Sequence, residues 1–122
     1  DMILIKDNHI DFAGGPAEAL RRATAYRERH ARPLAIEIET RRLAEVRAVL
    51  AEGGADRILL DNMSLETLRT AVAEIGARAE TEASGGINAD TIRAVAETGV
   101  DYVSVGALTH SYGSLDISLM AR

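Results

Sequence analysis

Apolar residues along this chain follow two patterns that alternate from one end to the other. In the first, an apolar residue stands at nearly every position, or at every second position, which predicts a β-strand. In the second, apolar residues recur three and four positions apart, which predicts an amphipathic helix. The predicted strands cover residues 3–5, 34–39, 57–60, 79–83 and 100–105. The predicted helices cover residues 16–29, 41–52 and 64–75, and a fourth runs from Asn88 or Asp90 to residue 97.

Residues typical of helix ends support these boundaries. Pro16 stands in the first turn of the first predicted helix, and Ser64 is suited to cap the third. The pair Gly53-Gly54 closes the second helix, and Gly99 closes the fourth.

Strands that alternate with helices through short loops predict parallel β-α-β units. Parallel strands are usually apolar throughout, yet segments 34–39 and 79–83 contain carboxylates. A barrel accounts for them better than an open sheet does, because polar residues near the carboxyl ends of barrel strands line the catalytic mouth. We therefore expect an α/β fold, part of a TIM-like α/β barrel, with five parallel strands and four helices.

A polar or small residue stands at the carboxyl end of each predicted strand: Lys6, Glu39, Asp61, Ser84 and Gly106. The last four are spaced by 22, 23 and 22 residues, the length of one strand–helix unit. Since every unit of a barrel delivers its end residue to the same face, we expect the five to converge at one mouth. Residues after strands are polar in many proteins, so the prediction depends on the whole set.

Two glycine turns at these strand ends predict a phosphate site. Ser84-Gly85-Gly86 stands between a strand and a helix, where glycines let backbone N–H groups approach an anion. A similar turn extends from Gly106 to His110. TIM-like barrels often bind phosphate in their last two strand–helix loops, so we expect the two turns to share one anion.

The carboxylates leave two interpretations open. Glu37 and Glu39 alternate with isoleucines, so both face one side of their strand, which is the interior in a barrel. Glu39 and Asp61 could hold Mg²⁺ or accept hydrogen bonds from sugar hydroxyls. They could equally form salt bridges with an interior arginine or with Lys6. Glu80 and Glu82 repeat the alternation and are weaker candidates.

Composition narrows the classes of function. The chain has 122 residues, a net charge of −5 and no basic block, which argues against nucleic-acid binding. No apolar run reaches the roughly 20 residues of a membrane span. Cysteine is absent, which excludes disulfides and agrees with a cytoplasmic location. Lys6 is the single lysine beside thirteen arginines, which suggests a position that the planar guanidinium group does not suit.

The three histidines have no metal-ligand spacing. We expect His9 to lie in the loop after Lys6 with a structural role, and His30 to end a helix and face solvent.

Five segments together resemble one known family, in the right order and over nearly the whole chain. They are Leu4-Ile5-Lys6-Asp7-Asn8-His9-Ile10, Glu37-Ile38-Glu39, Leu59-Leu60-Asp61-Asn62-Met63, Ser84-Gly85-Gly86-Ile87 and Ser104-Val105-Gly106-Ala107-Leu108-Thr109-His110-Ser111. The family is that of the quinolinate phosphoribosyltransferases. The resemblance implies that residues 1–122 are the C-terminal part of the barrel domain, without the family's N-terminal domain and first barrel elements.

The resemblance also implies an activity and a site. The family joins quinolinate to 5-phosphoribosyl-1-pyrophosphate with the help of Mg²⁺, and yields nicotinate mononucleotide, pyrophosphate and CO₂ for NAD biosynthesis. Lys6 is similar to the lysine that meets quinolinate and phosphate charge, and Glu39 and Asp61 are similar to the pair near the ribose and Mg²⁺. The residues similar to the phosphate-holding loops are Ser84, Gly85, Gly86, Gly106 and His110.

The family's site lies near a dimer interface, so a homodimer or a higher homo-oligomer is expected, and its other quinolinate contacts come from upstream residues. We therefore expect residues 1–122 alone to be inactive. The alternatives are a related barrel of a molybdate-transport locus, a barrel that binds a phosphorylated ligand without catalysis, and a purely structural fragment of a larger enzyme.

Overall fold

The computed structural model describes residues 2–30, 33–105 and 118–120, the last without their side chains. Its elements, in chain order, are β1 Met2–Ile5, α1 Asp7–Ala13, α2 Pro16–Arg29, β2 Ala35–Thr40, α3 Leu43–Glu52, β3 Arg57–Asp61, α4 Leu65–Ile75, β4 Glu80–Ser84, α5 Ile92–Ala96, β5 Tyr102–Ser104 and β6 Ser118–Met120.

The strands form one sheet in the order in which they follow along the chain. Neighbours from β1 to β5 are parallel, and β6 pairs with β5 in the antiparallel direction. The predicted α/β fold with five parallel strands is therefore confirmed. Two elements were not predicted, namely α1 and β6.

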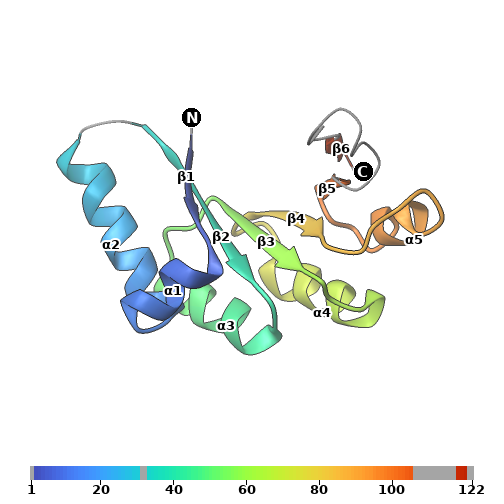
Figure 1. Ribbon diagram of the computed structural model, residues 1–122, viewed down its shortest axis with the longest axis horizontal. Coiled ribbons are helices and arrows are strands. Elements are labelled where there is room, and N and C mark those ends of the chain that lie inside the picture. The colour runs from blue at the N-terminus through green and yellow to red at the C-terminus, as the bar shows by residue number, and fades with distance from the viewer. Residues whose placement is uncertain (1, 31–32, 106–117, 121–122) are drawn as a thin grey trace.

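One face of the sheet carries the apolar core. Ile36, Ile38, Ile58, Leu60 and Val103 point to this face and are fully buried. Figure 1 shows α2, α3 and α4 side by side along this side of the sheet. Burial of such apolar surface is the main favourable contribution to folding, and here it fixes the strands that carry the polar residues.

The opposite face is polar because the alternate residues of each strand point there. The register aligns them in rows across the strands: Leu4 with Glu37, Arg57 and Glu80, then Glu39 with Leu59, Glu82 and Tyr102, and finally Asp61 with Ser84. The carboxylates of the predicted strands at residues 34–39 and 79–83 thus lie on the face away from the packed helices. This is the arrangement expected of a barrel interior.

Pro16, Gly53 and Ser64 stand at helix ends as predicted, whereas the C-cap of α5 is Glu97 and not Gly99, and this helix is shorter than predicted. The Ser64 hydroxyl accepts a hydrogen bond from the Thr67 N–H at 3.1 Å, as an N-cap does. The helix expected from Asn88 or Asp90 begins as a hydrogen-bonded turn between Asn88 and Thr91, so α5 itself starts only at Ile92. No helix of the described residues has the length and apolar character needed to cross a membrane.

Candidate functional site

Four of the predicted site residues lie at the carboxyl edge of the sheet. Asp61 and Ser84 are the last residues of β3 and β4, Glu39 is the last but one of β2, and Lys6 directly follows β1. We call these four the edge residues. The parallel register brings them to one edge because the carboxyl ends of parallel strands meet there.

Asp61 and Ser84 are in direct contact. The Ser84 hydroxyl donates a hydrogen bond to Asp61 Oδ1 at 3.1 Å, and the Asn62 N–H donates to the Ser84 carbonyl at 2.8 Å. These two bonds join the ends of β3 and β4 and fix the direction of the Asp61 carboxylate. Its second oxygen, Oδ2, meets Arg41 Nε only at 4.0 Å, and about a quarter of the side chain is exposed (28%), so a ligand can reach it.

Position 85 requires glycine both because of its backbone conformation and because neighbouring atoms leave no room for a side chain. Its φ is +86°, in the left-handed region that favours glycine. A Cβ atom added to Gly85 would lie 3.0 Å from the Asn62 nitrogen and 3.0 Å from Asp61 Oδ1. Gly86 follows with φ +65°, and its Cβ would have more room. The turn therefore leaves its backbone open beside the Asp61 carboxylate.

Glu39 is held by the chain that follows β1. The Asp7 N–H donates a hydrogen bond to Glu39 Oε1 at 3.1 Å. The Lys6 N–H donates to the His9 ring nitrogen Nδ1 at 3.3 Å, so His9 stabilises the start of α1. The Lys6 side chain is exposed, and its ammonium has no ion-pair partner among the residues described here.

The loop predicted after Lys6 is wrong, because Asp7–Ala13 forms α1. Asp7 stands in its first turn, where a negative charge is favourable, and Gly14 ends it with a left-handed backbone at φ +96°. His9 belongs to this helix, and its contact with Lys6 agrees with the predicted structural role. His30 ends α2 as predicted, and its ring stacks on Tyr26.

Arg41 is a site residue that the sequence reasoning missed. Its Nη2 lies 2.6 Å from Asp7 Oδ2, and its Nε lies 4.0 Å from Asp61 Oδ2. Asp61 therefore has an arginine as a distant partner, as the salt-bridge interpretation expects. Glu39 instead accepts a hydrogen bond from a backbone N–H. In a chain with thirteen arginines, nothing in the sequence marks this one as special.

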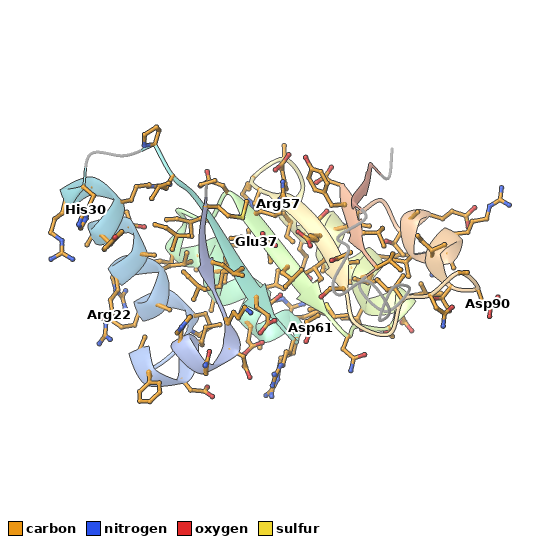
Figure 2. All side chains as sticks on the ribbon, turned by 45° about the horizontal axis from the view of Figure 1, so that its top comes forward. Arg22, His30, Glu37, Arg57, Asp61 and Asp90 are labelled. Carbon is orange, nitrogen blue, oxygen red and sulfur yellow. The ribbon has the colours of Figure 1, made fainter. Side chains whose placement is uncertain are left out.

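A second polar group lies further back along the strands. Its members share the sheet face of the edge residues and contact one another; we call this the inner cluster, Glu37, Arg57, Glu80, Glu82 and Tyr102. Figure 2 shows Glu37 and Arg57 close together and away from Asp61.

Arg57 is the centre of the inner cluster. Its guanidinium contacts Glu80 at 3.1 Å and Glu82 at 3.4 Å, and it lies over the Tyr102 ring at 3.9 Å. Its Nε is buried and has no hydrogen-bond partner among the described residues. The cluster therefore contains three carboxylates and one cation, which favours protonation of one carboxyl group.

That group is Glu37, which is only 5% exposed. Burial, followed by the hydrogen bond and the charge of Glu82, raises the pKa of Glu37 to about 7, against the opposing charge of Arg57. The carboxyl group of Glu37 is therefore mostly protonated below about pH 7, where an ordinary glutamate is ionised.

A cavity of about 350 Å³ adjoins the edge. It lies between the end of β4, the start of α4 and the turn before α5, and Asn62, Ser84 and Gly85 contribute polar atoms to its lining. Gly106 and His110, the predicted second half of the phosphate site, lie outside the described residues. Among the described residues no group of three or more His, Cys, Asp or Glu side chains is arranged to hold a metal ion.

Comparisons with known proteins identify one family over the same residues. The family model described as quinolinate phosphoribosyl transferase, C-terminal domain, matches residues 1–120. A decarboxylating quinolinate phosphoribosyltransferase of Nicotiana tabacum is 44% identical over 133 residues, which cover 98% of this chain and 38% of that protein. A probable carboxylating nicotinate-nucleotide pyrophosphorylase of Bacillus subtilis is 42% identical over 98% of this chain and 40% of its own length.

A solved structure with a similar fold bears the same name as one of these relatives. The solved nicotinate-nucleotide pyrophosphorylase of Francisella tularensis superposes with a TM-score of 0.81 at 36% identity, over 97% of this chain and 39% of that chain. This chain thus spans about two fifths of the length of the relatives that it matches.

Proposed function

This chain belongs to the family of quinolinate phosphoribosyl transferase C-terminal domains, and we propose that its sheet edge forms the phosphoribosyl-donor half of that active site. In the reaction, the nitrogen of quinolinate replaces pyrophosphate at the anomeric carbon of 5-phosphoribosyl-1-pyrophosphate. Loss of CO₂ then gives nicotinate mononucleotide. The proposal concerns the complete protein that contains these residues.

The observation that carries the proposal is the paired support of Asp61 and Glu39. Each carboxylate has one oxygen held by a neutral donor, Asp61 by Ser84 and Glu39 by the Asp7 N–H, and the second oxygen of Asp61 faces Arg41 only at 4.0 Å and stays within reach of a ligand. Departure of pyrophosphate leaves positive charge on the ribose ring. Fixed carboxylates stabilise that charge without having to reorganise, which is a major source of enzymatic rate acceleration.

The Ser84–Gly86 turn would bind a phosphate group of the donor. Its backbone is open beside Asp61, and the cavity of about 350 Å³ next to it contains apolar as well as polar lining. Backbone N–H groups in such turns bind anions well. Gly106 and His110 remain the predicted partners of this turn.

Lys6 would neutralise an anionic group of either substrate. It aligns with Glu39 across β1 and β2, and its ammonium extends from the edge into solvent. A compact ammonium approaches a carboxylate or phosphate as a point charge, whereas a guanidinium needs a planar arrangement of acceptors.

Mg²⁺ fits the donor set, although the described residues offer no closed metal cage. Glu39 and Asp61 supply hard oxygen atoms, and Mg²⁺ is usually bound by one or two carboxylates together with water and substrate phosphates. When bound, the ion would neutralise charge on the departing pyrophosphate. We further propose a homodimer or higher homo-oligomer. A cytoplasmic location is proposed for this protein, although its Nicotiana relative is named as mitochondrial.

The test is turnover by the complete protein that contains these residues. With quinolinate, 5-phosphoribosyl-1-pyrophosphate and Mg²⁺, we expect nicotinate mononucleotide and pyrophosphate in equal amounts. Asp61→Ala should strongly slow product formation, while Arg69→Ala, which removes an exposed arginine of α4, should not. Binding of the donor without any turnover would favour the non-catalytic barrel.

A chimaera tests the same proposal with the remaining residues supplied by a relative. The 122 residues would replace the matched segment of the Bacillus subtilis relative, which is 42% identical. An active chimaera supports the proposal. A folded chimaera with no turnover contradicts it.

A further inference from the structure

Arg41 stands where three strands end. It directly follows β2, and the register of β2 with β3 places it beside Asp61. Its backbone N–H donates to Glu45 Oε1 at 2.7 Å, which fixes the short connection to α3. The backbone of Arg41 is therefore held at the end of β2, beside Asp7 and Asp61.

The guanidinium of Arg41 links both halves of the proposed donor site. On one side its Nη2 contacts Asp7 Oδ2 at 2.6 Å, and on the other its Nε faces Asp61 Oδ2 at 4.0 Å. Asp7 in turn donates its backbone N–H to Glu39 Oε1 at 3.1 Å. One side chain thus connects Asp61 on β3 with the residue that orients Glu39 on β2.

The link matters for orientation more than for folding. Half of the Arg41 side chain is exposed (52%), and ion pairs exposed to this extent contribute little to the free energy of folding. A guanidinium has donors that diverge in one plane and can meet two carboxylates at once, which an ammonium on a flexible stem does less well.

We propose that Arg41 is a positioning residue that holds Asp7, and through it Glu39, in register with Asp61. The inference rests on the proposed function of Glu39 and Asp61. It assigns no contact with substrate to Arg41.

The first test needs no activity. In nuclear magnetic resonance spectra of the complete protein, Arg41→Gln should shift the side-chain carboxylate resonance of Glu39, because the Asp7 N–H that orients it loses its support. Arg42→Gln is the matched control, since Arg42 is exposed, adjacent and without an ion pair among the described residues. A Glu39 carboxylate resonance that moves no further in Arg41→Gln than in Arg42→Gln would overturn the proposal.

The second test uses kinetics. Loss of a residue that orients the groups of a site without touching the substrate typically lowers activity by about 10–100-fold. We expect a loss of this size in kcat/KM for the phosphoribosyl donor in Arg41→Gln, little rescue by Arg41→Lys, and unchanged thermal stability. Equal kinetics of Arg41→Gln and Arg42→Gln, with the wild type active, would contradict the inference and leave the proposed function intact. An inactive wild type would contradict the proposed function instead.

A double-mutant cycle identifies the route. If Arg41 acts through Asp7, Arg41→Gln combined with Asp7→Asn should lose no more activity than the more impaired single variant. Asp7→Asn keeps the backbone N–H that holds Glu39 and removes only the charge that Arg41 contacts. Fully additive losses would show that the two residues act independently and would refute the route through Asp7.

Discussion

The edge residues and the inner cluster share one face of one sheet, yet their carboxylates are in opposite situations. In the inner cluster, Glu80 and Glu82 are paired with Arg57, and Glu37 is buried with a pKa raised to about 7 by its burial. At the edge, Glu39 and Asp61 each have one oxygen bonded to an uncharged donor. Asp61 also faces Arg41, but only at 4.0 Å, and Glu39 has no cation partner among the described residues, so both keep more of their charge for a ligand than carboxylates in close contact with a cation.

The difference follows from position along the strands. Glu37 and Glu39 differ by one pleat of β2, but Glu37 lies beside Arg57 in the register and Glu39 lies beside Leu59. The same alternation of glutamate and isoleucine therefore produces a structural residue and a candidate catalytic residue. Substitutions in the two regions of the complete protein should separate these roles.

The largest effect is expected at Lys6. Lys6→Ala should lower kcat/KM by about 10³-fold, because an anionic substrate loses a cation of the edge that is not held in an ion pair among the described residues. Lys6→Arg should not restore it, since a guanidinium is larger and presents its donors in a plane. Steady-state kinetics of the two variants measure this. Near-normal activity of Lys6→Arg would mean that any cation suffices there.

The next largest effects are expected for the edge carboxylates, and their substitution compares the edge directly with the inner cluster. Glu39→Ala and Asp61→Ala should each cost roughly 2–4 kcal/mol of transition-state stabilisation. Glu80→Gln, in the inner cluster, should leave the turnover close to that of the wild type. Kinetics at several Mg²⁺ concentrations would reveal the difference. Equal losses in the two regions would mean that the carboxylates of the face act only through folding.

Gly85→Ala tests how tightly the edge is packed. Gly14→Ala is the matched control, because Gly14 also has a positive φ but its Cβ would meet nothing within 4 Å. Both variants should lose about 1 kcal/mol from backbone strain. Gly85→Ala should lose about 1–2 kcal/mol more, since its Cβ would collide with Asn62 and Asp61. Denaturant unfolding measures both; similar losses would show that the turn adapts.

The smallest effect is a pH dependence that arises in the inner cluster. The pKa of Glu37 is about 7 in the folded protein against an ordinary value of 4.5, so the folded state binds more protons between these values. Its contribution to stability is therefore full below pH 4.5 and is lost as the pH rises through 7, by about 1–3 kcal/mol. Denaturant unfolding between pH 4.5 and 8 measures it.

Glu37→Gln should flatten that part of the stability profile, because glutamine does not titrate. Glu66→Gln, an exposed carboxyl group at the start of α4, should preserve the wild-type profile. If Glu37→Gln and the wild type lose stability in parallel over this range, Glu37 is not the titrating group.

Most of the sheet could be predicted from the sequence because its two faces differ in polarity. Residues 79–83 show this difference in polarity. Thr81 and Ala83 are buried among the helices, while Glu80 and Glu82 point to the other face. Helix α1 could not be predicted in the same way. It has seven residues, a single fully buried apolar side chain in Ile10, and an exposed Phe12.

The site residues that stand at strand ends could be predicted from the sequence. Strand periodicity and the 22- to 23-residue spacing identified Glu39, Asp61 and Ser84. Arg41 lies beyond the end of β2, and its contacts with Asp7 of α1 and with Asp61 of β3 arise only in the folded protein. Spacing along a chain does not encode such contacts, because they join a loop residue to elements that are distant in the sequence.

The measurement that tests the central claim most directly is a crystal structure of the complete protein with Mg²⁺ and 5-phosphoribosyl-1-pyrophosphate. We predict that the ribose hydroxyls or the ion lie against Glu39 and Asp61, with a phosphate group on the Ser84–Gly86 turn. Donor bound to the inner cluster, or at the amino ends of the strands while the edge residues contact only solvent, would contradict the account.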